Sequence, residues 1–373
     1  MTISRFRLHI RTNVRFFAAT FAVLLSLYAA AEAQKTPAAE PAIQKCWEHK
    51  IGGAPDDRIA TDNAAVIIVR DRSFVEAVGL DAGKLLWSTD VGGQVNSNLL
   101  AANENVYFVR GSGTDGGDTS NLVAMSAATG VTRWTRPLNE PGYFTLGMIG
   151  GRVAAISVGG RVTIVSAGDG LPAWAGQLEG PLTAGPQIGP ANITYVAGSN
   201  KVISLSSPAF DMPTVAISPF AVRLAARFED DLIVWGDERG LVTSYSASSE
   251  KVEWSFKSGA AISSLAVVDG AVIVGSNDNF VYALGRGRGD RIWKKRVSGR
   301  IQSLKLVDED TLLLQTIGET NVRLLSVKNG KTIGQLSTSD QMPIAVAVTP
   351  GGRVVVVGEL SLFAYGLSGC PKN

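Results

Sequence analysis

The chain is poor in the side chains that most often carry out catalysis. It contains two histidines, His9 and His49, and two cysteines, Cys46 and Cys370. If His9 is removed with the N-terminus, Ser–His–Asp or Cys–His catalysis would have to use His49, and no nucleophile-elbow motif is present. One histidine cannot form a multi-histidine metal site. We therefore predict no catalytic residue, no metal ligand and no cofactor, and we expect His49 to be a solvent-facing residue of an edge strand.

Charged residues cluster in three places. Asp115 and Asp118 lie in a Gly-rich hairpin insertion, but their spacing departs from the EF-hand pattern, so a surface loop is expected rather than a calcium site. An acidic run at Glu229–Asp231, with Asp237 and Glu238, is expected to be a polar loop tip. A basic cluster is a candidate docking site for an acidic partner or an anionic surface, the alternative being a solvated strand pair. It consists of Arg286, Arg288, Arg291, Lys294, Lys295, Arg296 and Arg300.

Tryptophans recur at a nearly fixed interval and indicate the elements that must position these residues. Successive gaps are 40, 47, 40, 80 and 39 residues, close to one step of about 40 or its double. Each Trp follows an apolar strand and a Gly/Ser/Asp turn, which is typical of a four-stranded propeller blade. The predicted repeat-core residues are Trp47, Trp87, Trp134, Trp174, Trp254 and Trp293.

Two strand families can be counted separately, and each gives eight copies. One precedes the Trp positions. The other consists of short Val- and Ile-rich runs such as residues 65–69 and 354–357, which we expect to be inner strands packed on both faces. The last copy ends without its Trp strand, whereas the chain begins with an unpaired one at residues 46–51. We therefore predict an all-β fold: an eight-bladed β-propeller of four-stranded antiparallel blades, closed by the N-terminal strand joining the C-terminal blade.

The two cysteines agree with this closure. Cys46 begins the unpaired strand, and Cys370 lies in the turn where that strand would join the last blade. A disulfide between them is predicted, with two unpaired thiols as the alternative. Neither cysteine has a neighbour at metal-ligand or redox-motif spacing.

The N-terminus carries the features of a secretory signal. Four arginines between Arg5 and Arg15 precede an apolar stretch at residues 16–31 and a small-x-small site ending at Ala33. We expect a cleaved signal peptide at 1–33, a flexible leader at 34–44 and one propeller domain at 45–373, with an uncleaved anchor as the alternative. No cysteine lies at the expected cleavage point, so a lipid-modified N-terminus is not expected.

Removal of residues 1–33 changes the charge balance. It takes four Arg and one Glu from the 35 basic and 33 acidic residues, leaving 31 against 32 and a net charge of −1. A nucleic-acid partner is therefore not expected. The predicted mature protein is periplasmic, monomeric by itself and at most peripheral to the outer membrane.

The repeat resembles that of the quinoprotein-type, or PQQ-like, propellers, best at residues 123–134, VAMSAATGVTRW. This family includes PQQ-dependent dehydrogenases and the outer-membrane assembly proteins of the BamB type. The dehydrogenases carry a vicinal Cys-Cys and a calcium site, which do not match this chain. The chain is similar to the BamB type in length, blade number and secretion, but lacks a lipidated cysteine.

This resemblance implies a non-enzymatic periplasmic scaffold whose loop rim or exposed strand edge binds protein. Its partners would be the barrel assembly machinery or unfolded outer-membrane proteins. A ligand- or glycan-binding propeller that uses the channel mouth is the alternative. A relative of the PQQ-dependent dehydrogenases is a more remote alternative, and would require bound quinone and calcium.

Overall fold

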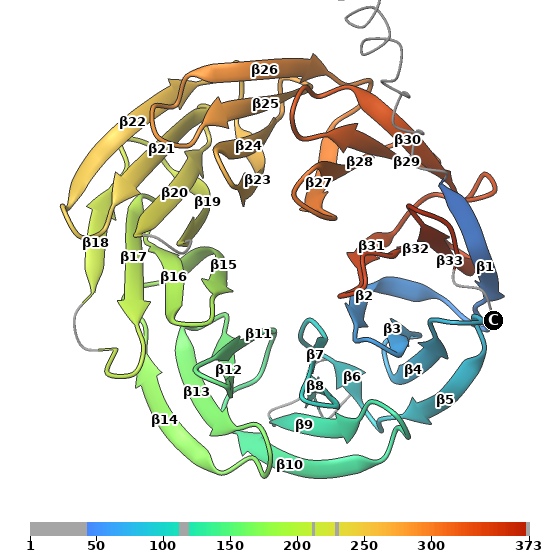
Figure 1. Ribbon diagram of the computed structural model, residues 1–373. Helices are drawn as coiled ribbons and strands as arrows, with labels where there is room; N and C mark the ends of the chain where they lie inside the picture. The colour runs from blue at the N-terminus through green and yellow to red at the C-terminus, as the bar shows by residue number, and fades with distance from the viewer. Residues whose placement is uncertain (1–42, 112–118, 211–212, 228–230, 371–373) are drawn as a thin grey trace, which may run out of the picture. The chain divides into compact units, whose positions relative to one another are not determined.

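The computed structural model describes residues 43–111, 119–210, 213–227 and 231–370, which form a closed ring of eight antiparallel sheets (Figure 1). Blade 1 contains β2 (Pro55–Thr61), β3 (Ala65–Arg70), β4 (Phe74–Gly79) and β5 (Leu85–Asp90). Blade 2 contains β6 (Gln94–Val95), β7 (Leu100–Ala102), β8 (Asn105–Gly111), β9 (Ser120–Ser126) and β10 (Thr132–Leu138). Blade 3 contains β11 (Phe144–Ile149), β12 (Arg152–Ser157), β13 (Arg161–Ser166) and β14 (Pro172–Gln177). Blade 4 contains β15 (Leu182–Ile188), β16 (Asn192–Ala197), β17 (Lys201–Ser206) and β18 (Thr214–Ile217).

The second half of the ring repeats this order. Blade 5 contains β19 (Val222–Arg227), β20 (Leu232–Asp237), β21 (Leu241–Ser246) and β22 (Lys251–Lys257). Blade 6 contains β23 (Ile262–Val268), β24 (Ala271–Ser276), β25 (Phe280–Gly285) and β26 (Arg291–Arg296). Blade 7 contains β27 (Ile301–Leu306), β28 (Thr311–Thr316), β29 (Asn321–Ser326) and β30 (Thr332–Ser337). Blade 8 combines β31 (Ala345–Val348), β32 (Val354–Val357) and β33 (Ser361–Gly366) with β1 (Gln44–Lys50) from the start of the chain.

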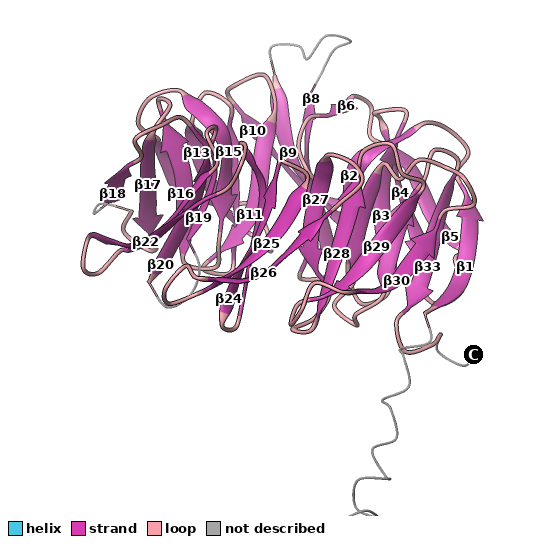
Figure 2. Ribbon diagram, turned by 90° about the horizontal axis from the view of Figure 1, so that it is seen from above, coloured by secondary structure: helices cyan, strands magenta, loops and turns pink. Residues whose placement is uncertain are grey.

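The predicted closure is confirmed. β1 pairs antiparallel with β33 as the outermost strand of blade 8, with Gln44 opposite Gly366 and Lys50 opposite Ser361. Seen from the side, the strands of all blades run between the two faces of the ring (Figure 2). Among the described residues we find no helix with the length and apolar character that a bilayer crossing needs.

The Val- and Ile-rich strands are inner strands as predicted, and a further strand that was not predicted lies between each of them and the channel. The Val- and Ile-rich strands, such as β3 and β32, are the second strands of their blades, not the innermost ones. They are almost fully buried because the sheets of adjacent blades cover both of their faces. The strands that line the channel, such as β2 and β15, are half-buried and mix polar with apolar residues.

Five of the six repeat Trp residues join their blade to the next by a hydrogen bond. The indole N–H of an outer-strand Trp donates a hydrogen bond to a carbonyl in the turn between the third and fourth strands of the following blade. The pairs are Trp47 with Leu80 (2.6 Å), Trp87 with Ala127 (2.8 Å), Trp134 with Ala167 (3.2 Å), Trp254 with Arg286 (2.7 Å) and Trp293 with Val327 (2.7 Å). In the same turn a glycine lies directly against the indole ring: Gly83, Gly130, Gly170, Gly289 and Gly330.

Among the described residues, the three remaining joints lack this combination of a Trp hydrogen bond and a glycine, and other residues occupy these positions. Trp174 contacts the ring of Phe210, 4.8 Å away, and Phe210 holds the turn position that glycine holds elsewhere, with a positive φ of 56°. On β30 the Trp position is Gly334, and the side chain of Ile43 lies over it. On β18 it is Thr214, by register with the third strand.

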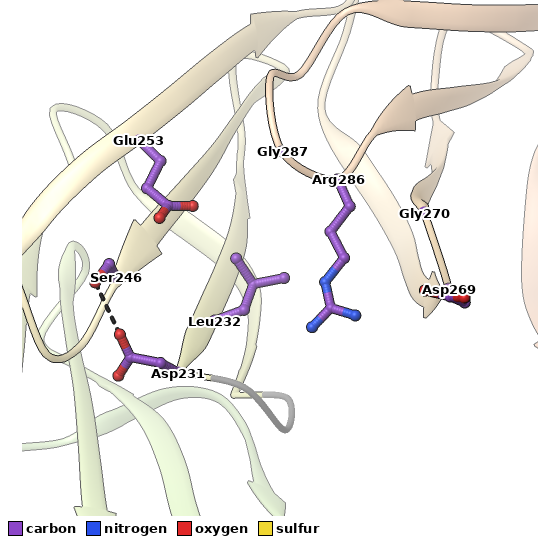
Figure 3. Close-up of a pocket in the computed structure, with 8 residues that line it drawn as sticks. All are labelled: Asp231, Leu232, Ser246, Glu253, Asp269, Gly270, Arg286 and Gly287. Atoms are coloured by element: carbon purple, nitrogen blue, oxygen red, sulfur yellow. Dashed lines mark hydrogen bonds between the residues drawn. The ribbon is translucent and has the colours of Figure 1, made fainter.

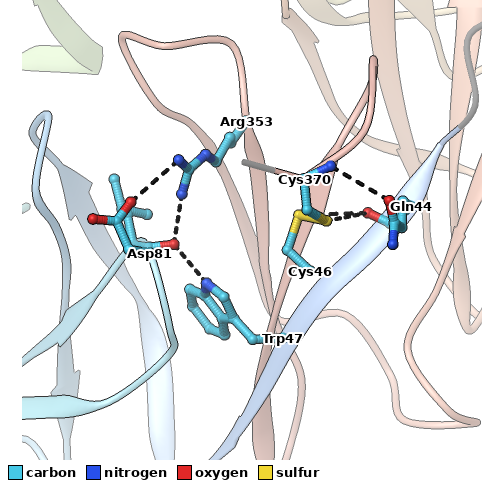
Figure 4. The surroundings of a disulfide bond; sticks show 7 residues. Gln44, Cys46, Trp47, Asp81, Arg353 and Cys370 are labelled. Atoms are coloured by element: carbon cyan, nitrogen blue, oxygen red, sulfur yellow. Dashed lines mark hydrogen bonds and ion pairs between the residues drawn. A yellow bond between two sulfur atoms is a disulfide. The ribbon is translucent and has the colours of Figure 1, made fainter. Parts of the chain in front are cut away.

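The predicted disulfide is present and lies at the end of the ring closure (Figure 4). Cys46 on β1 is bonded to Cys370 in the turn after β33. Beside it, the Leu80 carbonyl of blade 1 accepts hydrogen bonds from Trp47 and from Arg353 of blade 8, and Arg353 also pairs with Asp81 at 3.3 Å. Blades 8 and 1 are therefore joined by side chains from both termini of the ring.

Candidate partner-binding surfaces

The predicted basic cluster is spread over one blade and does not form a single surface. Arg286 and Arg288 lie in the turn before β26, Arg300 lies in the linker to blade 7, and the other four lie on β26. The ammonium group of Lys294 lies 5.1 Å from the centre of the Phe280 ring, on the side of the blade that faces blade 5. Trp293 lies on the opposite side of the blade, which packs against blade 7. Lys295 is two residues further along the same strand and therefore lies on that side as well.

Arg286 points into a cleft between blades 5 and 6, and the other residues of the basic cluster do not line this cleft (Figure 3). The cleft has a volume of about 390 Å³ and contains the carboxylates of Asp231, Glu253 and Asp269. The backbone of Arg286 is fixed from both sides, because its N–H donates to Gly270 (3.0 Å) and its carbonyl accepts from Trp254. Three acids and one arginine therefore line this cleft.

Asp231 of the acidic run therefore lines the same cleft as Arg286 of the basic cluster. Asp231 accepts hydrogen bonds from the Ser246 hydroxyl (2.8 Å) and from the backbone N–H of Ser248 (2.9 Å), so it also fixes the turn after β21. The expectation of a polar tip was wrong for Asp237, which is fully buried and accepts backbone N–H bonds from Arg239 and Leu241. It holds the turn between β20 and β21 together. Glu229, Asp115 and Asp118 lie outside the described residues.

His49 differs from its expected role. Its ring is half-buried, and its Nδ1 atom lies 2.8 Å from the Gly83 carbonyl of blade 1. In the tautomer that protonates Nδ1, this is a hydrogen bond across the joint between blades 8 and 1. His49 therefore belongs to the closure. Within the described ranges, no group of three His, Cys, Asp or Glu side chains is placed to hold a metal ion.

The outer strands differ in a way that the sequence patterns did not reveal. In seven blades the outer strand has a register shift next to the Trp position, the signature of a β-bulge. The described pairing of β18 with β17 ends at Thr214, the Trp position, so the place where the other blades have their shift lies outside the described residues. Bulges and charged side chains both protect strand edges from pairing with other chains.

β18 lacks charge on the face that carries Val215 and Ile217. Val215 and Ile217 are 37% and 63% exposed there. By register, the corresponding residues are Lys294 and Arg296 on β26, and Gln335 and Ser337 on β30. β18 is thus an outer edge strand with two exposed β-branched aliphatic side chains. Only the three-dimensional pairing reveals this, because the strand has lost the Trp that marks the repeat.

The family model and the curated relative that match this chain both carry the description BamB. The family model described as outer membrane protein assembly factor BamB matches residues 40–157, 71–209 and 214–370. The BamB of Burkholderia pseudomallei (strain K96243) is 25% identical over 301 residues, which cover 73% of this chain and 74% of the relative.

Two solved structures show the same fold. The crystal structure of BamB from Moraxella catarrhalis has a TM-score of 0.65 at 14% identity, covering 89% of this chain and 99% of that one. The computationally designed Ika8 protein has a TM-score of 0.68 at 14% identity, covering 87% and 100%. At these identities the structural likeness concerns the fold alone.

Proposed function

The chain belongs to the family of the outer membrane protein assembly factor BamB, and from this premise we propose that it is a non-enzymatic periplasmic scaffold that binds polypeptide during outer-membrane protein assembly. Family membership supports the assembly role. The expected signal peptide supports export, and the Cys46–Cys370 disulfide agrees with an oxidising compartment such as the periplasm. His49 and the repeat Trp residues serve the joints between blades, so the proposed role rests on surfaces and needs no reaction step.

The edge of β18 is the single observation that carries this proposal. The Ser218 N–H donates to the Asn200 carbonyl (2.9 Å), which sets the alternation of hydrogen bonds along β17 and β18. In an antiparallel pair, every second residue turns its backbone groups away from the partner strand. On β18 these residues are Val215 and Ile217, so their backbone N–H and C=O groups face the open edge. The Tyr245 hydroxyl reaches the Val215 carbonyl at 3.4 Å, which leaves that oxygen a second lone pair.

An extended segment with alternating apolar and polar residues fits this edge. Its backbone would continue the sheet of blade 4, and its apolar residues would lie beside Val215 and Ile217. Strands of outer-membrane barrels have this alternation. We therefore assign the proposed site to unfolded barrel segments.

Site-specific crosslinking in cells tests the proposal. A photoreactive residue at position 217 should form adducts with outer-membrane barrel proteins that are awaiting assembly, identified by mass spectrometry. Position 337 is the matched control, because Ser337 holds the equivalent place on β30 and carries a polar side chain. Ile217→Lys should abolish copurification of these clients while the protein remains folded. Equal adducts from positions 217 and 337, or none from either with the protein well expressed, would contradict the proposed site.

We also propose that the basic residues of β26 contact an acidic region of the assembly machinery. Arg291 and Arg296 are exposed on the outer strand. Replacing both with Glu should reduce crosslinking to that machinery and leave the adducts from position 217 in place. A variant that copurifies the machinery at the wild-type level would show that this strand is only a solvated face.

A further inference from the structure

An apolar cavity lies at the end of the channel where the innermost strands finish. It has a volume of about 500 Å³ and is bounded by the last residues of β2 and by residues of β23, β27 and β31, which belong to four consecutive blades. Eight of its ten lining residues are aliphatic, among them Ile59, Val267, Leu304 and Leu306. Ligand sites in proteins have this size and this mainly apolar lining.

Lys305 is the one charged residue that lines this cavity. Its ammonium group donates to the Val346 carbonyl at 2.5 Å, and no ion pair that the described part of the chain forms includes it. Lys305 is exposed to solvent, yet enough protein surrounds its ammonium group for desolvation to lower the pKa of Lys305. A cation in such surroundings gains from an anion close to it.

The other polar lining residue offers no competing charge. The Thr61 hydroxyl donates to the Val348 carbonyl at 3.2 Å, so its single proton is already used. Lys305 has three N–H groups and the Val346 carbonyl takes one of them. The unused donors of the cavity are therefore concentrated at one point, and the rest of its wall is aliphatic.

We infer that this cavity binds a small amphiphilic anion, a carboxylate on an aliphatic chain, with the carboxylate on Lys305 and the chain against the aliphatic wall. A single ammonium suits a singly charged carboxylate. A phosphate dianion would call for more donors than this wall offers. The strands that bound the cavity line the channel, whereas β18 lies on the outer circumference of the ring, so the inference is separate from the site proposed on β18 (Figure 1).

The test is a fluorescence titration of the full-length mature protein with dansyl-undecanoic acid. Saturable binding is expected. Lys305→Met should weaken it by about 10- to 100-fold, since a hydrogen bond to a charged group contributes on the order of 1.5–3 kcal/mol. Lys305→Arg keeps the positive charge and should keep most of the affinity, which would show that a substitution at this position does not by itself disrupt the cavity. Lys331→Met, at an exposed turn in blade 7, is the matched control and should bind like the wild type.

An uncharged analogue separates the carboxylate from the chain. Dansyl-undecanamide should bind the wild type and Lys305→Met with the same weak affinity. Absence of saturable binding of the acid would overturn the inference, as would equal affinity of the wild type and a folded Lys305→Met for it. Crosslinking from position 217 is read separately, so failure of one proposal is distinguishable from failure of the other.

Discussion

Single polar side chains take over the joints from which the repeat Trp is missing. Tyr365 on β33 is almost fully buried, and its hydroxyl donates to the Ser337 carbonyl at the end of β30. Blade 7 has Gly334 at its Trp position, so this hydrogen bond does for blades 7 and 8 what an indole N–H does elsewhere. A phenol in this role should make the joint sensitive to alkaline pH.

Tyr365→Phe should remove part of the alkaline instability of the protein. Burial raises the pKa of Tyr365 to about 12, and the charge of Glu48 acts in the same direction. A tyrosine in the unfolded chain ionises near pH 10, so the unfolded state loses its proton first and stability falls between pH 10 and pH 12. The loss is on the order of 2–3 kcal/mol.

Urea unfolding of the wild type and of Tyr365→Phe across this pH range measures the effect. The variant should be less stable by about 1 kcal/mol at neutral pH, because it lacks the hydrogen bond. It should then lose less stability above pH 10. The same slope in both proteins would show that Tyr365 does not titrate in the way its burial indicates.

At the scale of the element, the turn glycines and the outer-strand Trp residues form one unit across each joint. Gly130 has a φ of 68°, and a Cβ atom built on it would lie 2.6 Å from the Trp87 ring. An alanine there would meet both backbone strain and a steric clash. Gly352, in the turn between β31 and β32, has a φ of 75° and open space around it. An alanine at Gly352 would therefore meet the backbone strain without the steric clash.

Gly130→Ala should therefore destabilise the protein more than Gly352→Ala does. Left-handed backbone strain costs about 1–2 kcal/mol at either position. Displacing the indole of Trp87 should add roughly 1–3 kcal/mol at Gly130 only. Chemical denaturation measures both variants. Equal losses would mean that the indole moves aside without cost and that the Trp–Gly contact does not set the joint.

The sequence predicted those elements whose physical role leaves a visible residue pattern. Trp and Gly recur at the positions of Trp87 and Gly130 because the large indole ring packs against a turn that has no room for a Cβ atom. Strands such as β3 are continuously apolar because both of their faces are buried. The innermost strands could not be recognised, because strands such as β2 face both the channel and a neighbouring blade and so carry mixed residues. The edge of β18 and the position of Lys305 depend on register and on four separate blades, which no local pattern records.

At the scale of the whole molecule, the stability of the ring depends on one strand. β1 is the N-terminal segment of the ring, and it brings Trp47 and His49 to carbonyls of blade 1. The disulfide keeps β1 on blade 8, and its partners are 324 residues apart. By the chain-entropy model, a loop of this length contributes about 5–6 kcal/mol, mainly by restricting the unfolded chain.

Cys46→Ser combined with Cys370→Ser should leave a folded ring that opens first at β1. Its pairing with β33 and the Trp47 hydrogen bond remain, so the fold persists with a free energy of unfolding lower by up to about 5–6 kcal/mol. Hydrogen exchange should accelerate most in β1 and β33 and in the turn at residues 80–84, and less in blades 3 to 6.

Arg353→Met provides the comparison, because Arg353 joins the same two blades without touching the disulfide. Alone it should cost about 1–3 kcal/mol through the hydrogen bond lost to Leu80. In the background without the disulfide, the cost should differ from this value, because residues that hold one joint act together. If the two losses were simply additive and β1 kept its protection, the disulfide would act only on the unfolded chain and closure would rest on strand pairing alone.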